Sequence, residues 1–135
     1  MQNSQEIASL LDGFYGTERY YYNDLSKHNK MVYTDGVKAM AKVCEANWLI
    51  DAISSYQSEC KKDDMLFGFQ KWTLKVKDRK GILICERDVN DIAFTQEFDF
   101  TDFPLDEISF FVEQGYTSLD GIEQPVMVLM LMTEH

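Results

Sequence analysis

Two hydrophobic periods divide the chain. In residues 34–56, apolar side chains such as Val37, Met40 and Cys44 recur at steps of three and four, which is the period of an amphipathic helix. After residue 71 the apolar positions recur at every second residue, which is the period of a strand with one buried face. The pattern therefore predicts helices in the first half of the chain and strands in the second.

Capping residues indicate where the helices begin. Ser4 precedes an apolar pattern over residues 5–12, and Thr34 precedes the long pattern that reaches Tyr56. Serine and threonine are favoured at these positions because their hydroxyl oxygens accept hydrogen bonds from free amides of the first turn. A break near Ala46 and Asn47 divides the long pattern into two helices.

Three strand-like segments follow one another in residues 72–77, 82–85 and 92–100. Polar residues at 78–81 and 88–91 supply the turns between them, so the three segments form an antiparallel meander. In the third segment, alternation places four apolar side chains toward the core: Ile92, Phe94, Phe98 and Phe100.

The remaining apolar segments are shorter or less regular. Residues 31–33 are extended, and residues 108–112 fit a strand better than a helix. Residues 126–132 are apolar at both parities, which is typical of a strand covered on both faces. Its three methionines either fill the core or form an adaptable contact surface.

These elements predict one α+β domain over residues 1–135, with N-terminal helices packed on an antiparallel sheet of four to five strands. A chain of 135 residues with 45% hydrophobic residues is long and apolar enough for one core. We expect Trp48, Trp72, Phe94 and Phe98 to share that core, because they have a common apolar parity.

The composition places the chain in the cytoplasm. No apolar run approaches the ~20 residues of a membrane span, and the first residues lack the basic and apolar parts of a secretory signal. Cys44, Cys60 and Cys85 lie far apart without a Cys-x-x-Cys pair. We therefore expect buried reduced thiols and neither a disulfide framework nor a zinc site.

The net charge of −10 is concentrated in the last part of the chain. Residues 1–85 contain 12 Lys or Arg and 11 Asp or Glu, whereas residues 86–135 contain 12 acidic residues and one basic residue, Arg87. Such a field repels nucleic acid and attracts basic surfaces. We expect no direct binding of nucleic acid, although a face that only keeps the protein in solution would carry the same charge.

No pattern of catalytic residues is present. The two histidines, His28 and His135, lie in a polar run and at the end of the chain, and no phosphate-binding loop or metal-ligand spacing occurs. We expect no enzyme activity, catalytic residue, metal or cofactor. If a catalytic site exists, the best candidates are Tyr33, Asp35 and Asp51, although Asp51 fits better as a half-buried polar anchor.

Acidic residues of the second half form the predicted partner-binding surface. Asp91, Glu97 and Asp99 share the outward parity of one strand, on which alternate residues are ~6.6–7 Å apart, close to the phosphate spacing of a nucleic-acid strand. Neighbouring turns add further carboxylates. The full predicted set is Asp88, Asp91, Glu97, Asp99, Asp102, Asp106 and Glu107.

Five separated blocks resemble a known family. They are Gly16-Thr17-Glu18 followed by tyrosines, VYTDGVK at residues 32–38, NWLIDAI at 47–53, FQKWTLKV at 69–76 and FTDFPLDEI at 100–108. Together they resemble a family of short, uncharacterised proteins from bacteria, phages and other mobile elements. The resemblance covers most of residues 13–112 and implies a mobile-element context, with no established activity or functional residue.

Two functions remain open at this level. The first is a non-catalytic acidic binding protein of phage or mobile-element type. It would inhibit a host nuclease or defence complex by binding to a basic surface of that complex. The alternative is an accessory or self-associating module that has no inhibitory role and adds its apolar last strand to a partner or to a second copy as a homodimer. Neither function involves a membrane.

Overall fold

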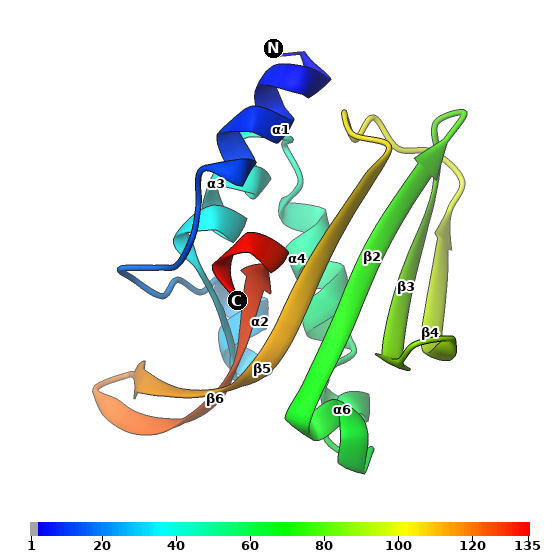
Figure 1. Cartoon of the computed structure of the whole chain (residues 1–135). Coiled ribbons are helices and arrows are strands. Elements are labelled where there is room, and N and C mark those ends of the chain that lie inside the picture. Colours follow the sequence, from blue (N-terminus) through cyan, green and yellow to red (C-terminus); the bar gives the residue numbers. More distant parts are fainter. Residues whose placement is uncertain (1–2) are drawn as a thin grey trace.

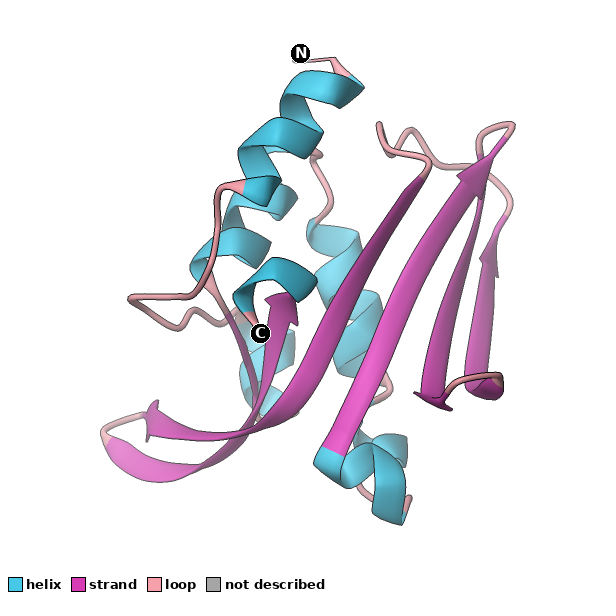
Figure 2. Ribbon diagram, viewed as in Figure 1, coloured by secondary structure: helices cyan, strands magenta, loops and turns pink. Residues whose placement is uncertain are grey.

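Helices occupy most of the first half of the chain and strands most of the second, as the change of hydrophobic period predicts (Figure 2). The computed structural model describes residues 3–135. The elements are α1 (Ser4–Asp12), α2 (Asp24–His28), β1 (Met31–Tyr33), α3 (Asp35–Val43), α4 (Asn47–Ser55), α5 (Gln57–Cys60), α6 (Asp64–Gly68), β2 (Phe69–Lys77), β3 (Lys80–Asp88), β4 (Asp91–Phe98), β5 (Glu107–Leu119), β6 (Ile122–Leu131) and the 3-10 turn η1 (Met132–Glu134).

Within residues 3–135 the strands form one six-stranded sheet of order β1-β6-β5-β2-β3-β4. The α+β class is confirmed, but the predicted antiparallel sheet of four to five strands is wrong. The short segment Met31–Tyr33 is a strand and pairs in parallel with β6, which makes the sheet mixed. The helices are also not a simple N-terminal block, because β1 interrupts them and η1 ends the chain.

Side-chain caps set the starts of the helices. Thr34 caps α3 as predicted, with its hydroxyl oxygen accepting from the Val37 amide at 3.3 Å. For α1 the cap is Asn3 and not Ser4, since the Asn3 side chain accepts from the Glu6 amide at 2.8 Å. The predicted break between α3 and α4 is confirmed at Glu45, whose positive φ of 51° ends the first helix.

Both predicted hairpin turns are present. Asp78 and Arg79 join β2 to β3 in a two-residue turn, and both have positive φ, 55° and 63°. This geometry matches the twist of the flanking strands. At the opposite end of the sheet, Asp88 pairs with Asp91 around the β3–β4 turn.

The main core lies between the sheet and helices α1, α3 and α4, which cover one of its faces (Figure 1). Trp72 is buried at its centre, and Trp48, Phe94 and Phe98 pack against the cluster, as predicted. The Tyr56 ring lies near both Trp72 and Phe94, with centroid distances of 5.4 and 5.0 Å.

Two residues assigned to this core are exposed. Ile92 and Phe100 are 53% and 66% exposed, so their predicted inward orientation is wrong. Register shifts in the β3–β4 pairing interrupt the alternation near Ile92, and Phe100 lies beyond the end of β4. Parity along the sequence therefore holds only for the regular middle of the strand.

Strand β6 is interior and covered on both faces, which confirms the core interpretation of this apolar segment. It is paired with β1 on one side and β5 on the other. Met127, Leu129 and Leu131 join the main core, and the alternate side chains form a second cluster on the other face with Val32 and Leu119. Residues 127–129 of β6 are paired on both sides and are not free to extend the sheet of a partner, whereas residues 122–126 pair with β5 alone in the described residues.

A buried pair of amides links the helices to the sheet. The side chains of Gln57 and Gln70 are fully buried and exchange two hydrogen bonds of 3.0 and 2.9 Å. The Trp72 indole N–H donates to the same Gln70 oxygen at 2.7 Å. Each buried polar group is thus satisfied, which removes the desolvation cost that an unpaired amide would have.

The C-terminal turn is fixed to the start of α3 by Glu134. Its carboxylate accepts from the Thr34 hydroxyl at 2.6 Å and from the Gly36 amide at 3.0 Å. A Cβ atom at Gly36 would lie 2.6 Å from the carboxylate, so only glycine permits this contact. A negative charge at a helix N-terminus is also stabilised by the helix dipole.

No helix within residues 3–135 has the length and apolar character needed to cross a membrane.

The position of Trp72 leads to a stability prediction. We expect Trp72→Ala to lower the free energy of unfolding by ~3–5 kcal/mol, because it leaves a large cavity in the core. The measurement is urea unfolding followed by circular dichroism. Tyr15→Ala, at a side chain that is 81% exposed, is the control and should change stability by at most about 0.5 kcal/mol. A Trp72 variant as stable as the control would contradict this packing.

The contact between Thr34 and Glu134 is tested by a double-mutant cycle. We expect Thr34→Ala to cost about 1–2 kcal/mol through loss of the cap. In a Glu134→Ala background the same change should cost less by at least about 0.5 kcal/mol, because the shared hydrogen bond is already absent. Strictly additive effects would show that the C-terminal turn does not contribute through Thr34.

Candidate interaction surface

The seven predicted binding residues divide into two groups at opposite ends of β4. Asp88 and Asp91 flank the β3–β4 turn, where β4 begins. Glu97 follows Asp91 by six positions along the strand, a distance of roughly 20 Å. The group at the far end consists of Glu97, Asp99, Asp102, Asp106 and Glu107, and it is called the acidic end below. The structure therefore does not form one continuous row from all seven carboxylates.

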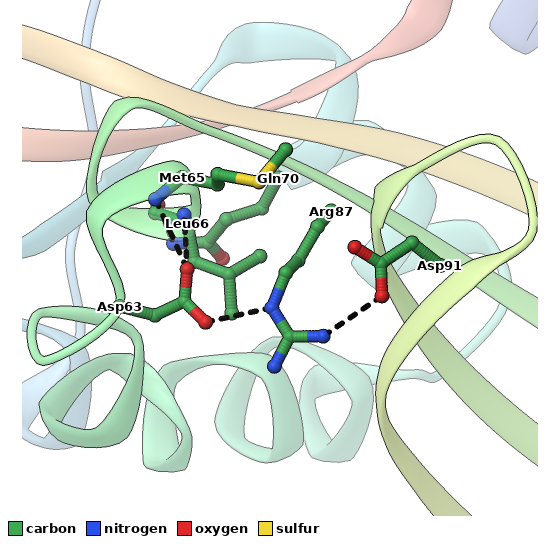
Figure 3. Close-up of polar contacts among 6 residues, drawn as sticks. All are labelled: Asp63, Met65, Leu66, Gln70, Arg87 and Asp91. Atoms are coloured by element: carbon green, nitrogen blue, oxygen red, sulfur yellow. Dashed lines mark hydrogen bonds and ion pairs between the residues drawn. The ribbon is translucent and has the colours of Figure 1, made fainter.

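Arg87 neutralises Asp91 and connects it to Asp63 (Figure 3). Its guanidinium donates to Asp63 at 2.6 Å and to Asp91 at 3.0 Å, and its side chain is 28% exposed. Asp63 also caps α6, accepting from the amides of Met65 and Leu66 at 3.0 and 3.1 Å. The Arg87 guanidinium, helped by these amides, holds the pKa of the Asp63 carboxyl below its usual value. The Asp63 and Asp91 carboxylates thus have a structural role in joining α6 to the hairpin, whereas the Asp88 side chain is exposed and, among the described residues, accepts only from the Val89 amide.

The carboxylates of the acidic end lack such partners. All five are exposed, and in the part of the chain that the structure describes none forms an ion pair or a side-chain hydrogen bond. Basic residues do lie nearby on the β2–β3 hairpin. In the sheet register Lys75 pairs with Glu107 on one side and with Ile82 on the other, and Ile82 pairs with Glu97. Lys75 therefore lies on an interior strand of the sheet, whereas Glu97 lies on the edge strand β4.

Several hollows accompany the acidic end, and one of about 460 Å³ is lined by Glu97 and Asp99 together with Lys75, Lys77 and Lys80. A groove of about 730 Å³ lies between the β2–β3 turn and the β4–β5 loop, and charges of both signs line it, including Arg79 and Asp102. A smaller hollow of about 300 Å³, called the aromatic notch below, is lined by Trp48, Phe98, Phe100, Thr101 and Asp102. In it the rings of Trp48 and Phe98 meet edge to face, with their centroids 5.1 Å apart.

The three residues named as catalytic candidates have structural contacts. Asp35 accepts from the Glu18 amide at 2.8 Å and from the Tyr21 hydroxyl at 2.9 Å. These bonds, led by that from the Glu18 amide, lower the pKa of the Asp35 carboxyl. Asp51 accepts from the Asn23 side chain at 3.0 Å, as expected of a polar anchor. Tyr33 lies in the core, and burial raises the pKa of its phenol.

The cysteines are buried free thiols, as predicted. Burial raises the pKa of the Cys44 thiol to about 11. The pKa of the Cys85 thiol is also raised, first by its contact with Cys60 and then by burial. The Cys44 and Cys85 thiols are therefore protonated at neutral pH, and all three buried cysteines pack as small apolar groups. Within residues 3–135, no three side chains of the His, Cys, Asp or Glu types are grouped as metal ligands.

Sequence reasoning missed the aromatic notch. Parity placed Phe100 in the core, and nothing in the spacing of Trp48 shows that its helix passes the end of β4. The only local signal was the turn predicted at Asp102 and Pro104. A strand that ends before this turn no longer imposes inward–outward alternation on Phe100. The ion pair between Asp63 and Arg87 joins residues 24 positions apart and had no local signal.

The lowered pKa of Asp63 predicts a pH-dependent contribution to stability. Because the folded-state pKa lies below the unfolded value of about 3.9, the ionised form stabilises the fold above that pH, and this stability is lost on further acidification. We expect Asp63→Asn, which retains a capping oxygen, to be less stable than the wild type at pH 7. The difference should narrow below about pH 4.

Urea unfolding at several pH values measures this difference. Asp64→Asn is the matched control, since Asp64 is exposed and is not an ion-pair partner of Arg87. If the difference in free energy of unfolding between the wild type and Asp63→Asn stays constant from pH 7 to pH 3, ionisation of Asp63 contributes nothing to stability.

Comparison with known proteins gives the family of the chain. Neither curated proteins nor solved structures contain a significant match. A family model matches residues 5–135, which is nearly the whole sequence. The match extends through β6 and η1, beyond the blocks that carry the resemblance in residues 13–112. The chain therefore belongs to DUF6876, a family of unknown function.

Proposed function

We propose that this protein is a non-catalytic binding protein and that its acidic end docks on a basic surface of a partner protein. The observation that carries this proposal is the set of five exposed carboxylates without an intramolecular ion partner in residues 3–135. A carboxylate already paired with Arg or Lys loses that pair when a partner binds. Unpaired carboxylates do not have this cost, and nearby lysines such as Lys75 reduce their field only in part.

The fold holds these charges in place. Glu97 is on β4 and Glu107 on β5, and both strands are paired in the sheet. The loop between them is anchored by the buried Phe103 ring and by the Thr101 amide, which donates to the Arg79 carbonyl at 2.8 Å. Carboxylates on a supported frame need little ordering when they bind, so more of the electrostatic attraction remains as affinity.

The mobile-element context implied by the family resemblance suggests the class of partner. Host nucleases and defence complexes have basic grooves that bind phosphates, and an acidic protein is attracted to the same grooves. Occupying such a groove in the cytoplasm would inhibit the host complex. The protein would then act by competition with nucleic acid and would need neither a cofactor nor a catalytic residue.

A second candidate function is an accessory or self-associating module. The observation that favours it is the free side of β4, which is paired with β3 alone in the described residues. Edge-to-edge pairing of two copies would give a symmetric homodimer. Light scattering after size exclusion separates the two candidates, since the first requires a monomer with an accessible acidic end and the second requires a dimer.

The test of the proposed function is affinity capture from a bacterial lysate, with quantification by mass spectrometry. The charge-reversed variant is Glu97→Lys with Asp99→Lys. The matched control is Glu18→Lys with Glu123→Lys, which makes the same change in net charge at two exposed sites away from the acidic end. We expect the wild type and the control to recover the same basic partner at low salt, and the charge-reversed variant to recover about tenfold less.

Higher salt should weaken capture by the wild type, because screening shortens the range of exposed charges. Equal recovery by both double variants would mean that the acidic end is only a solvated face. Thermal unfolding of each variant is measured in parallel, so that a loss of binding through unfolding is recognised.

A further inference from the structure

The two edges of the sheet differ in how they are closed. The β1 edge is short, and Tyr21 covers it by exchanging two backbone hydrogen bonds of 2.8 Å with Tyr33. The β4 edge has eight residues and, within residues 3–135, pairs only with β3 (Figure 1). Unpaired amides and carbonyls along such an edge are a template for another extended chain.

Strand β4 has few of the features that normally protect an edge. It contains no proline and no lysine, and the shifts in its register lie near its start. From Phe94 to Phe98 its pairing with β3 is regular, so the free side presents a straight row of backbone groups. Natural sheets usually blunt an edge of this kind with lysine, proline or a bulge in its middle.

The aromatic notch lies at the end of this edge. Phe98 is the last residue of β4, and Phe100 follows two positions later with 66% of its surface exposed. Trp48 of α4 forms the wall on the helix side, and Asp102 contributes a carboxylate. An aromatic hollow with a carboxylate suits an arginine side chain, whose guanidinium stacks on aromatic rings and forms hydrogen bonds with acids.

Charge decides between the possible occupants of the edge. Asp91, Glu97 and Asp99 are on or beside β4, and residues 88–135 contain no Lys or Arg. A second copy paired with this edge would bring two acidic strands together, and like charges on neighbouring strands are destabilising. A strand with alternating basic side chains reverses the sign of that interaction.

We infer that β4 binds an extended basic segment of the partner protein as an added strand, with one arginine side chain in the aromatic notch. This inference rests on the proposed function and deepens it. The acidic end supplies attraction and orientation, the free backbone of β4 supplies directional hydrogen bonds, and the notch selects the register of the bound segment.

The probe is a synthetic eight-residue peptide, as long as β4, in which Lys or Arg alternates with Val or Thr. The control peptide has the same sequence and charge but is N-methylated at four consecutive central residues, which blocks hydrogen bonding at both of its edges. Binding to the ¹⁵N-labelled protein is followed by chemical-shift titration. We expect shifts concentrated in β4 and the notch, and a Kd about tenfold weaker for the methylated peptide.

A pair of exposed apolar residues provides matched protein variants. Phe100→Ser removes one wall of the notch, whereas Ile122→Ser changes a residue of similar exposure, 64%, at the β5–β6 turn. We expect Phe100→Ser to weaken binding of the arginine-containing peptide about fivefold and Ile122→Ser to leave it unchanged. Replacing each arginine of the peptide by lysine should remove most of the difference between these two variants.

The outcomes separate this inference from the proposed function. Equal binding of both peptides, with shifts around the acidic end, would overturn strand addition and leave docking by charge intact. Binding of neither peptide at low salt would contradict both. A dimer of the free protein whose interface protects β4 would overturn the inference, because a second copy would then occupy the edge.

Discussion

The parallel pairing of β1 with β6 joins residues 31–33, in the first quarter of the chain, to its last strand. Much of the remaining structure depends on this pairing. Three residues of β1 are too few to hold a strand alone, so the pairing depends on the layers around it. Helices cover one face of β6, and the second apolar cluster with Val32 covers the other. Glu134 then fixes the end of the chain to the first turn of α3. A strand that is apolar on both faces is stable only in such an interior position.

The sheet is covered at its β1 edge and open at its β4 edge. With the middle of β6 interior and β1 covered by Tyr21, β4 is the edge strand of the described sheet that pairs on one side along its whole length. Residues 114–119 of β5 and 122–126 of β6 also pair on one side only, with each other. The end of β4, the loop that follows it and the start of β5 hold five carboxylates without an ion partner in residues 3–135, whereas Arg87 pairs with Asp91 at the start of β4. Structural charge and available charge are thus separated along one strand. This separation distinguishes an end with a structural ion pair from the end at which we propose binding, which net charge alone does not reveal.

Local patterns in the sequence predicted the local structure. The cap at Thr34, the break before α4, both hairpin turns and the shared core of Trp48 and Trp72 follow from periodicity and turn chemistry. The parallel partner of β6 was not predictable in this way, because three residues near the start of the chain give no signal of what they pair with. Alternation also failed for Phe100, since it describes a strand and the chain has already left the sheet there. For the candidate site, the sequence identified the acidic residues but could not show which of them Arg87 neutralises.

Native-state amide hydrogen exchange tests the central claim that β4 is an open edge of the sheet, whereas the middle of β6 is closed on both sides. In the free protein we expect the amides of residues 127–129 in β6 to exchange only through global unfolding, because both sides of the strand are paired there. In residues 94–98 of β4, we expect every second amide to exchange rapidly, because it faces solvent and not β3. Uniformly slow exchange along β4, equal to that of β6, would show that its edge is already covered and would contradict this account.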